Sequence, residues 1–140
     1  MKLYRLISIT FAVIFAIVGM LFLLMPDAVI VFFNTISTFV GMPVVPTAGF
    51  NFYVVLAAGY MYIVTVLAFL MYRNPKNAQL PFLLAQAKIA SSFLSFLAFV
   101  FVHHCLIYVS NFVIDGIIGG IALTFYLKLK KEKECARLSQ

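Results

Sequence analysis

A single lysine, Lys88, interrupts the long apolar stretch that runs from Leu80 to Val102. A charged side chain inside a membrane span is costly, and it usually faces protein groups or water rather than lipid. Ser92 and Ser95 follow Lys88 at intervals of four and three residues, so a helix places all three on one face. This face therefore predicts a polar centre within a membrane.

The counter-charge that the sequence offers for Lys88 is Asp115, which also lies well inside an apolar run. Counted from the ends of their runs, the two Cα atoms differ in depth by roughly 8 Å. Helical side chains lean toward the N-terminus of their own helix, so these two lean apart. This lean works against a direct pair, although long side chains could close the gap. A direct contact and a bridge through water, Ser92 or a backbone carbonyl therefore both stay open. In the alternative, Lys88 extends its aliphatic stem to the cytoplasmic surface and Asp115 lies near the wet outer face.

Three glycines follow Asp115 in the last apolar run: Gly116, Gly119 and Gly120. Gly116 and Gly120 form a GxxxG pair, which lets two helices approach closely in lipid. The small face that carries Ser92 and Ser95 is the natural partner for these glycines. Helix packing alone would explain this pattern without any functional role.

Two adjacent histidines, His103 and His104, precede Cys105 at the end of the third apolar run. Together with Met25 and Met42 on the same side, they are the candidate ligands for a cofactor such as haem or copper. Adjacent histidines point in different directions on a helix, and the chain has no third histidine for a bis-His haem across two helices. A His/Met site, a ligand from a partner, or simple hydrogen bonding to loop carbonyls and lipid headgroups all stay open. We assign no metal site and no catalytic residue.

The composition describes an integral membrane protein. Hydrophobic residues make up 65% of the 140 residues and charged residues 10%, whereas soluble domains carry about 25% charged residues. The first apolar run is longer than the core of a signal peptide and lacks a cleavage site before Pro26, so we expect it to span the membrane. The net charge of +6 comes from residues that flank apolar runs, which indicates membrane topology and not nucleic-acid binding.

The runs predict an all-α, antiparallel bundle of four transmembrane helices with a short interfacial helix on the outer side. The expected spans are about 6–25, 52–72, 80–102 and 108–128, with the short helix over 27–39. Residues 1–127 then form one membrane domain, and residues 128–140 form a charged cytoplasmic tail. Apart from Lys88, lysine and arginine are confined to the two termini and the connection around Arg73. This distribution predicts that both termini face the cytoplasm across a cell (inner) membrane.

The architecture resembles that of DoxX-type bacterial membrane proteins over most of the chain. Besides four short helices and cytoplasmic termini, the resemblance involves Pro26, Gly59, Leu67 and Pro75. It would imply a quinone-linked redox role. Many members of that group carry an acidic residue just after the second-span glycine, where this chain has Tyr60, Met61 and Tyr62.

The sequence favours a non-catalytic accessory or scaffold subunit of a larger bacterial inner-membrane complex, because its ionisable groups are too few for a catalytic set. Its expected partners are the lipid bilayer and other membrane subunits or further copies of itself. One alternative is a redox-associated subunit that binds quinone or haem near the outer face, through His103 and His104. Another is a small transport or lipid-binding protein centred on Lys88 and Asp115.

Overall fold

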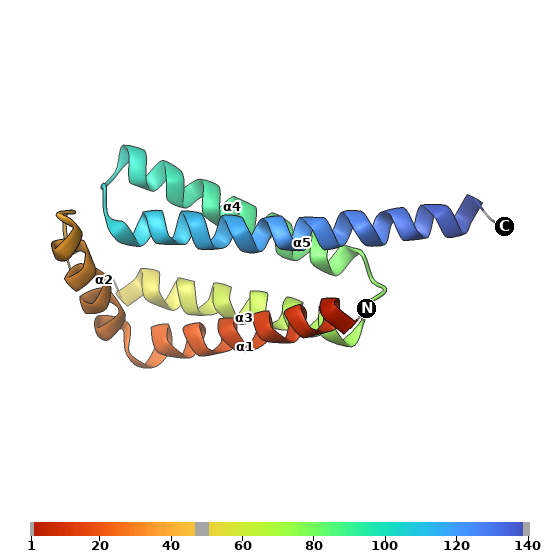
Figure 1. The fold of residues 1–140 in the computed structure, drawn as a ribbon. Coiled ribbons are helices and arrows are strands. Elements are labelled where there is room, and N and C mark those ends of the chain that lie inside the picture. The colour runs from red at the N-terminus through yellow and green to blue at the C-terminus, as the bar shows by residue number, and fades with distance from the viewer. Residues whose placement is uncertain (1, 47–50, 139–140) are drawn as a thin grey trace.

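The computed structural model describes residues 2–46 and 51–138, with side chains for residues 2–46 and 55–135. Within these ranges the chain is all-helical, as the sequence predicts (Figure 1). The helices are α1 (Lys2–Leu24), α2 (Pro26–Val40), α3 (Asn51–Arg73), α4 (Gln79–Phe101) and α5 (Leu106–Leu138). Met1, residues 47–50 and the last two residues of the predicted tail lie outside the described residues.

Four of these helices are long and apolar enough to cross a membrane. They are α1, α4, the segment Val55–Arg73 of α3 and the segment Leu106–Cys135 of α5. Large apolar side chains cover the outside of the bundle, including Ile63, Leu94 and Ile117, each more than half exposed. A surface of this kind is stable against lipid tails and not against water. The chain is therefore a helical membrane protein.

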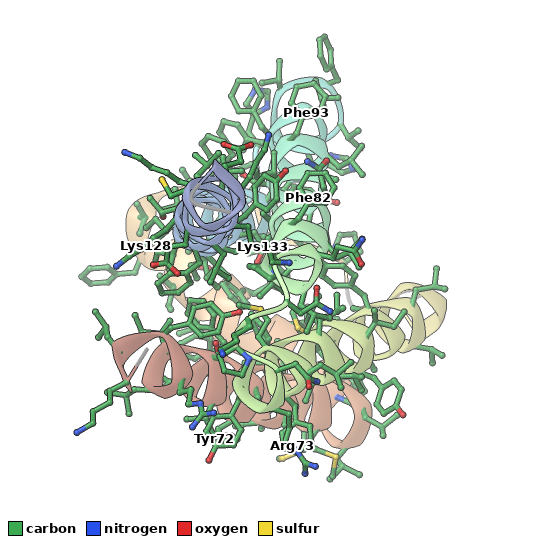
Figure 2. All side chains as sticks on the ribbon, turned by 90° about the vertical axis from the view of Figure 1, so that its right-hand side faces the viewer. Tyr72, Arg73, Phe82, Phe93, Lys128 and Lys133 are labelled. Atoms are coloured by element: carbon green, nitrogen blue, oxygen red, sulfur yellow. The ribbon has the colours of Figure 1, made fainter. Side chains whose placement is uncertain are left out.

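The bundle consists of two antiparallel helix pairs. Helix α1 packs along α3, and α4 packs along α5, while the short connection after Arg73 joins α3 to α4. Figure 2 looks at the bundle from the end where the N-terminus lies, and shows the α4–α5 pair apart from the α1–α3 pair. Buried side chains between the pairs include Phe15, Val64, Leu84 and Ala122.

Helix α2 crosses the opposite end of the bundle and contacts both α1 and α5 (Figure 1). It begins at Pro26, whose fixed φ suits the first helical turn, and Asp27 follows in that turn. It ends at Val40 and is capped by Gly41, which adopts φ 73°. Glycine takes this left-handed conformation without strain because it has no Cβ. Asn34 then fixes the return of the chain, since it donates to the Val45 carbonyl (2.9 Å) and accepts from the Val45 amide (2.8 Å).

Helix α5 continues without interruption through Lys128, where the sequence predicts the membrane domain to end. Its 33 residues correspond to about 50 Å, well beyond the roughly 30 Å of a hydrocarbon core. The described part of the charged tail is thus a helical extension of the last span.

Two of the three predicted packing glycines lie in the seam between α4 and α5. A Cβ on Gly116 would lie 3.1 Å from Ser92 Oγ, and one on Gly119 would lie 2.8 Å from Ile89 Cγ1 and 3.2 Å from the Ile89 backbone nitrogen. A Cβ on Gly120 would meet nothing within 4 Å. The close approach of these helices therefore depends on Gly116 and Gly119, and not on Gly120.

This difference gives a matched pair of variants. Gly119→Ala forces the new methyl group against the backbone of α4, and we expect it to lower the stability by about 1–3 kcal/mol. Gly120→Ala adds a methyl group where there is space, and should leave the stability unchanged or slightly higher. Thermal unfolding of both proteins in mild detergent measures the effect. Equal stabilities would contradict the seam described here.

Candidate functional site

Lys88 and Asp115 form a direct, buried ion pair that joins α4 to α5. The Lys88 Nζ atom lies 2.8 Å from Asp115 Oδ1, and the two side chains are 1% and 3% exposed. The sequence leaves open a direct contact or a bridge through water, Ser92 or a backbone carbonyl, and the structure has the direct contact. The depth count started at Val109, whereas helix α5 begins at Leu106, so Asp115 lies about 4.5 Å deeper than expected. The remaining difference of about 3.5 Å is short enough for the two side chains to span.

Two aromatic rings from the other helix pair cover the ammonium group. Lys88 Nζ lies 4.6 Å from the ring centre of Phe15 on α1 and 5.0 Å from that of Tyr60 on α3. Each desolvated contact of this kind contributes about 2 kcal/mol. The ammonium thus interacts with α1, α3 and α5 at once, and it does not extend to the membrane surface.

The carboxylate of Asp115 is only half satisfied. Its Oδ1 atom accepts the bond from Lys88, whereas its Oδ2 atom is buried and has no hydrogen-bond partner among the described residues. A buried acceptor without a donor costs about 1–3 kcal/mol, and a charged one costs more. The site therefore has an unused acceptor beside a neutralised charge.

The two predicted serines lie on the same face of α4 but do not bond to Lys88. Ser92 Oγ donates to the Phe112 carbonyl (2.8 Å), and Asn111 Nδ2 donates to Ser95 Oγ (2.6 Å) and Ser91 Oγ (3.3 Å). Asn111 is missing from the predicted site. Its position four residues before Asp115 places it on the same face of α5, and that spacing could have revealed it.

A cavity of about 590 Å³ lies between α1, α2 and α5, and Lys88 and Asp115 line its inner end. Its walls run along α1 from Ile14 to Met25, the residue just after that helix, and along α5 from Ile107 to Ile118, about 16 Å in each case. Nearly all of the lining side chains are apolar, with Ser110 and Asn111 as further polar groups. Helix α2 closes the cavity at the end of the bundle.

The cavity has an opening on the side of the bundle. Helices α1 and α5 are not among the pairs that pack extensively against each other. Ile14, Leu21 and Ile114 line the cavity and are also about half exposed. A molecule dissolved in the bilayer could therefore enter between α1 and α5 without passing through water.

The histidines do not join this site. His103 and His104 lie in the connection between α4 and α5, and their side chains are exposed. The ring centres of His104 and Phe99 lie 5.2 Å apart in a T-shaped arrangement. Cys105 beside them is buried, and burial raises the pKa of its thiol. Over the described ranges no three side chains among His, Cys, Asp and Glu come together as metal ligands.

A second hollow, also of about 590 Å³, lies at the end of the bundle opposite α2. Its lining contains no acidic residue. Besides Asn74, Pro75 and Asn77, four cationic residues line it: Arg5, Arg73, Lys76 and Lys133. Figure 2 looks onto this end, where Arg73 belongs to α3 and Lys133 to α5. These four side chains are exposed, so they suit contact with the aqueous boundary of a membrane more than binding of a buried ligand.

Comparison with protein-family models, curated proteins and solved structures found no match for this chain. The resemblance to DoxX-type proteins stays a prediction from the sequence. The functional argument therefore depends on the geometry of the site alone.

The ion pair can be tested with a double-mutant cycle. Lys88→Met or Asp115→Leu alone leaves one buried charge uncompensated, which should cost about 3–5 kcal/mol of unfolding free energy. The double variant removes both charges and should recover most of that loss, because it replaces a buried pair by apolar groups of similar size. Unfolding of the four proteins in the same detergent provides the measurement. Additive losses in the double variant would show that the pair does not act as a unit.

Proposed function

We propose that the protein binds a small lipid-like molecule inside the membrane, in the cavity between α1, α2 and α5. The observation that carries this proposal is the combination of an apolar cavity with a buried ion pair at its inner end. Binding sites for small molecules are typically apolar hollows of about 300–1,000 Å³ in which a few polar groups fix the orientation of the ligand. This proposal corresponds to the lipid-binding alternative from the sequence.

The structure supports binding more than turnover at this site. The Lys88 ammonium contacts a carboxylate and two aromatic rings, so its position is fixed and its charge is already compensated. A group held in this way orients a ligand. The redox alternative has less support, since His103 and His104 lie in an exposed connection and do not line the cavity.

A role as a subunit of a larger membrane complex is a second candidate, and it is compatible with ligand binding. One observation favours it: the open space beside Gly120 on α5. A small residue on an unoccupied helix surface allows another transmembrane helix to approach closely. Co-purification of a stoichiometric partner that Gly120→Leu removes would support this role.

We further propose that the end opposite α2 faces the cytoplasm of a bacterial inner membrane. All arginines and lysines except Lys88 belong to this end, including those around the basic hollow. At the α2 end, the connections contain Asp27, His103 and His104 but no lysine or arginine. An asymmetry of this kind sets the orientation of helical membrane proteins.

Ligand binding can be tested by filling the cavity. Val18→Trp places a large ring in the cavity, because Val18 is one of its lining residues. Ile17→Trp is the matched control, because its side chain is exposed on the outside of the same helix. We expect the first variant to reduce the amount of co-purifying lipid-like molecules about tenfold, a change of about 1.4 kcal/mol in binding. Native mass spectrometry and extraction of the purified proteins measure the bound material, and equal amounts in both variants would refute the proposal.

The orientation can be tested with the native cysteines. Cys135 on α5 is exposed, whereas Cys105 is buried and its thiol pKa is raised. Only the thiolate reacts readily, so a thiol reagent should modify Cys135 much faster than Cys105. A membrane-impermeant maleimide should leave Cys135 unmodified in intact spheroplasts and modify it after lysis. Modification of Cys135 before lysis would place the C-terminal end outside the cell.

A further inference from the structure

We infer that the ligand of the cavity is a neutral molecule with one hydroxyl group on an apolar body, and that this hydroxyl donates a hydrogen bond to Asp115 Oδ2. The inference rests on the proposed function, because it names the chemical class that the same cavity selects. It starts from the one polar atom of the ion pair that has no partner, Asp115 Oδ2.

The site offers an acceptor and no free donor of comparable strength. An ionised carboxylate only accepts hydrogen bonds. The Lys88 ammonium is the strongest donor there, and it already contacts Asp115 Oδ1, the Phe15 ring and the Tyr60 ring. A ligand that donates therefore completes the site, whereas a ligand that only accepts competes with the Phe15 and Tyr60 rings for the remaining N–H groups of Lys88.

The charge of the site selects against ionic ligands. Lys88 and Asp115 neutralise each other at 2.8 Å, so a bound carboxylate or phosphate would add an uncompensated negative charge in a region of low dielectric. A primary amine could donate to Oδ2, but it would add a positive charge in the same way. A hydroxyl supplies the donor and keeps the site neutral.

The depth of the site limits the size of the polar group. Lys88 and Asp115 each lie nine residues into helices that start from opposite ends of the bundle, which places the pair about 14 Å from either end, near the middle of the bilayer. The cavity between this point and α2 is lined mainly by apolar side chains, among them Phe22 and Phe33. A large headgroup that needs water has no place there, so the polar part of the ligand is as small as a hydroxyl.

The inference predicts a preference between matched probes. Wild-type protein in phosphatidylcholine nanodiscs is titrated with tetradecanol, its methyl ether or tetradecanoate, and native mass spectrometry measures the bound fraction. The ether keeps the oxygen and the chain but cannot donate. We expect tetradecanol to bind about tenfold more tightly than the ether or the acid. The double variant Lys88→Met with Asp115→Leu should bind the alcohol and the ether equally.

The outcomes separate this inference from the proposed function. Equal binding of alcohol and ether by the wild type would overturn the hydroxyl inference and leave the cavity as an unselective lipid site. Tighter binding of tetradecanoate would also overturn it, and would make Lys88 the group that recognises the ligand. If no probe binds and Val18→Trp retains its co-purifying lipid, both the inference and the proposed function fail.

Discussion

The arrangement of this bundle depends on one constraint: a lysine in the middle of a bilayer must be neutralised without water. Lys88 meets this requirement with Asp115 on α5, and with the faces of Phe15 on α1 and Tyr60 on α3. The ion pair fixes the register of α4 against α5, since a slip of one turn would separate the charges by about 5.4 Å. The two rings connect the separate helix pairs at the same point. A single buried charge thus contacts all four spanning helices.

Small residues beside the pair set the local packing of α4 and α5. The backbones of the two helices approach closely there because glycines carry no Cβ. Gly116 follows Asp115 directly and lies against Ser92, and Gly119, about one turn after Asp115, lies against Ile89. Asn111 and Ser95 bond to each other one turn toward α2. The ion pair, the glycine contacts and the Asn111–Ser95 hydrogen bond therefore form one continuous seam between α4 and α5.

Much of this fold could be predicted from the sequence, because the length of an apolar run and the absence of breakers decide where a spanning helix lies. Lys88 and Asp115 could be recognised because charges are rare in such runs. Whether they contact each other directly could not be decided from the sequence, since α5 begins at Leu106 and no strong turn residue marks that start. The cavity was not predictable at all. It depends on the distance between α1 and α5, two helices separated by most of the chain, and on the path of α2 across them.

The uninterrupted length of α5 has a mechanical consequence. Asp115 lies near the middle of the bilayer, and the helix continues from there to Leu138, a distance of about 35 Å. A rigid helix that pivots at Asp115 by about 5° would displace its far end by about 3 Å. A tilt of α5 as one body about the ion pair would therefore move Lys130, Lys131 and their neighbours farther than the residues that line the cavity.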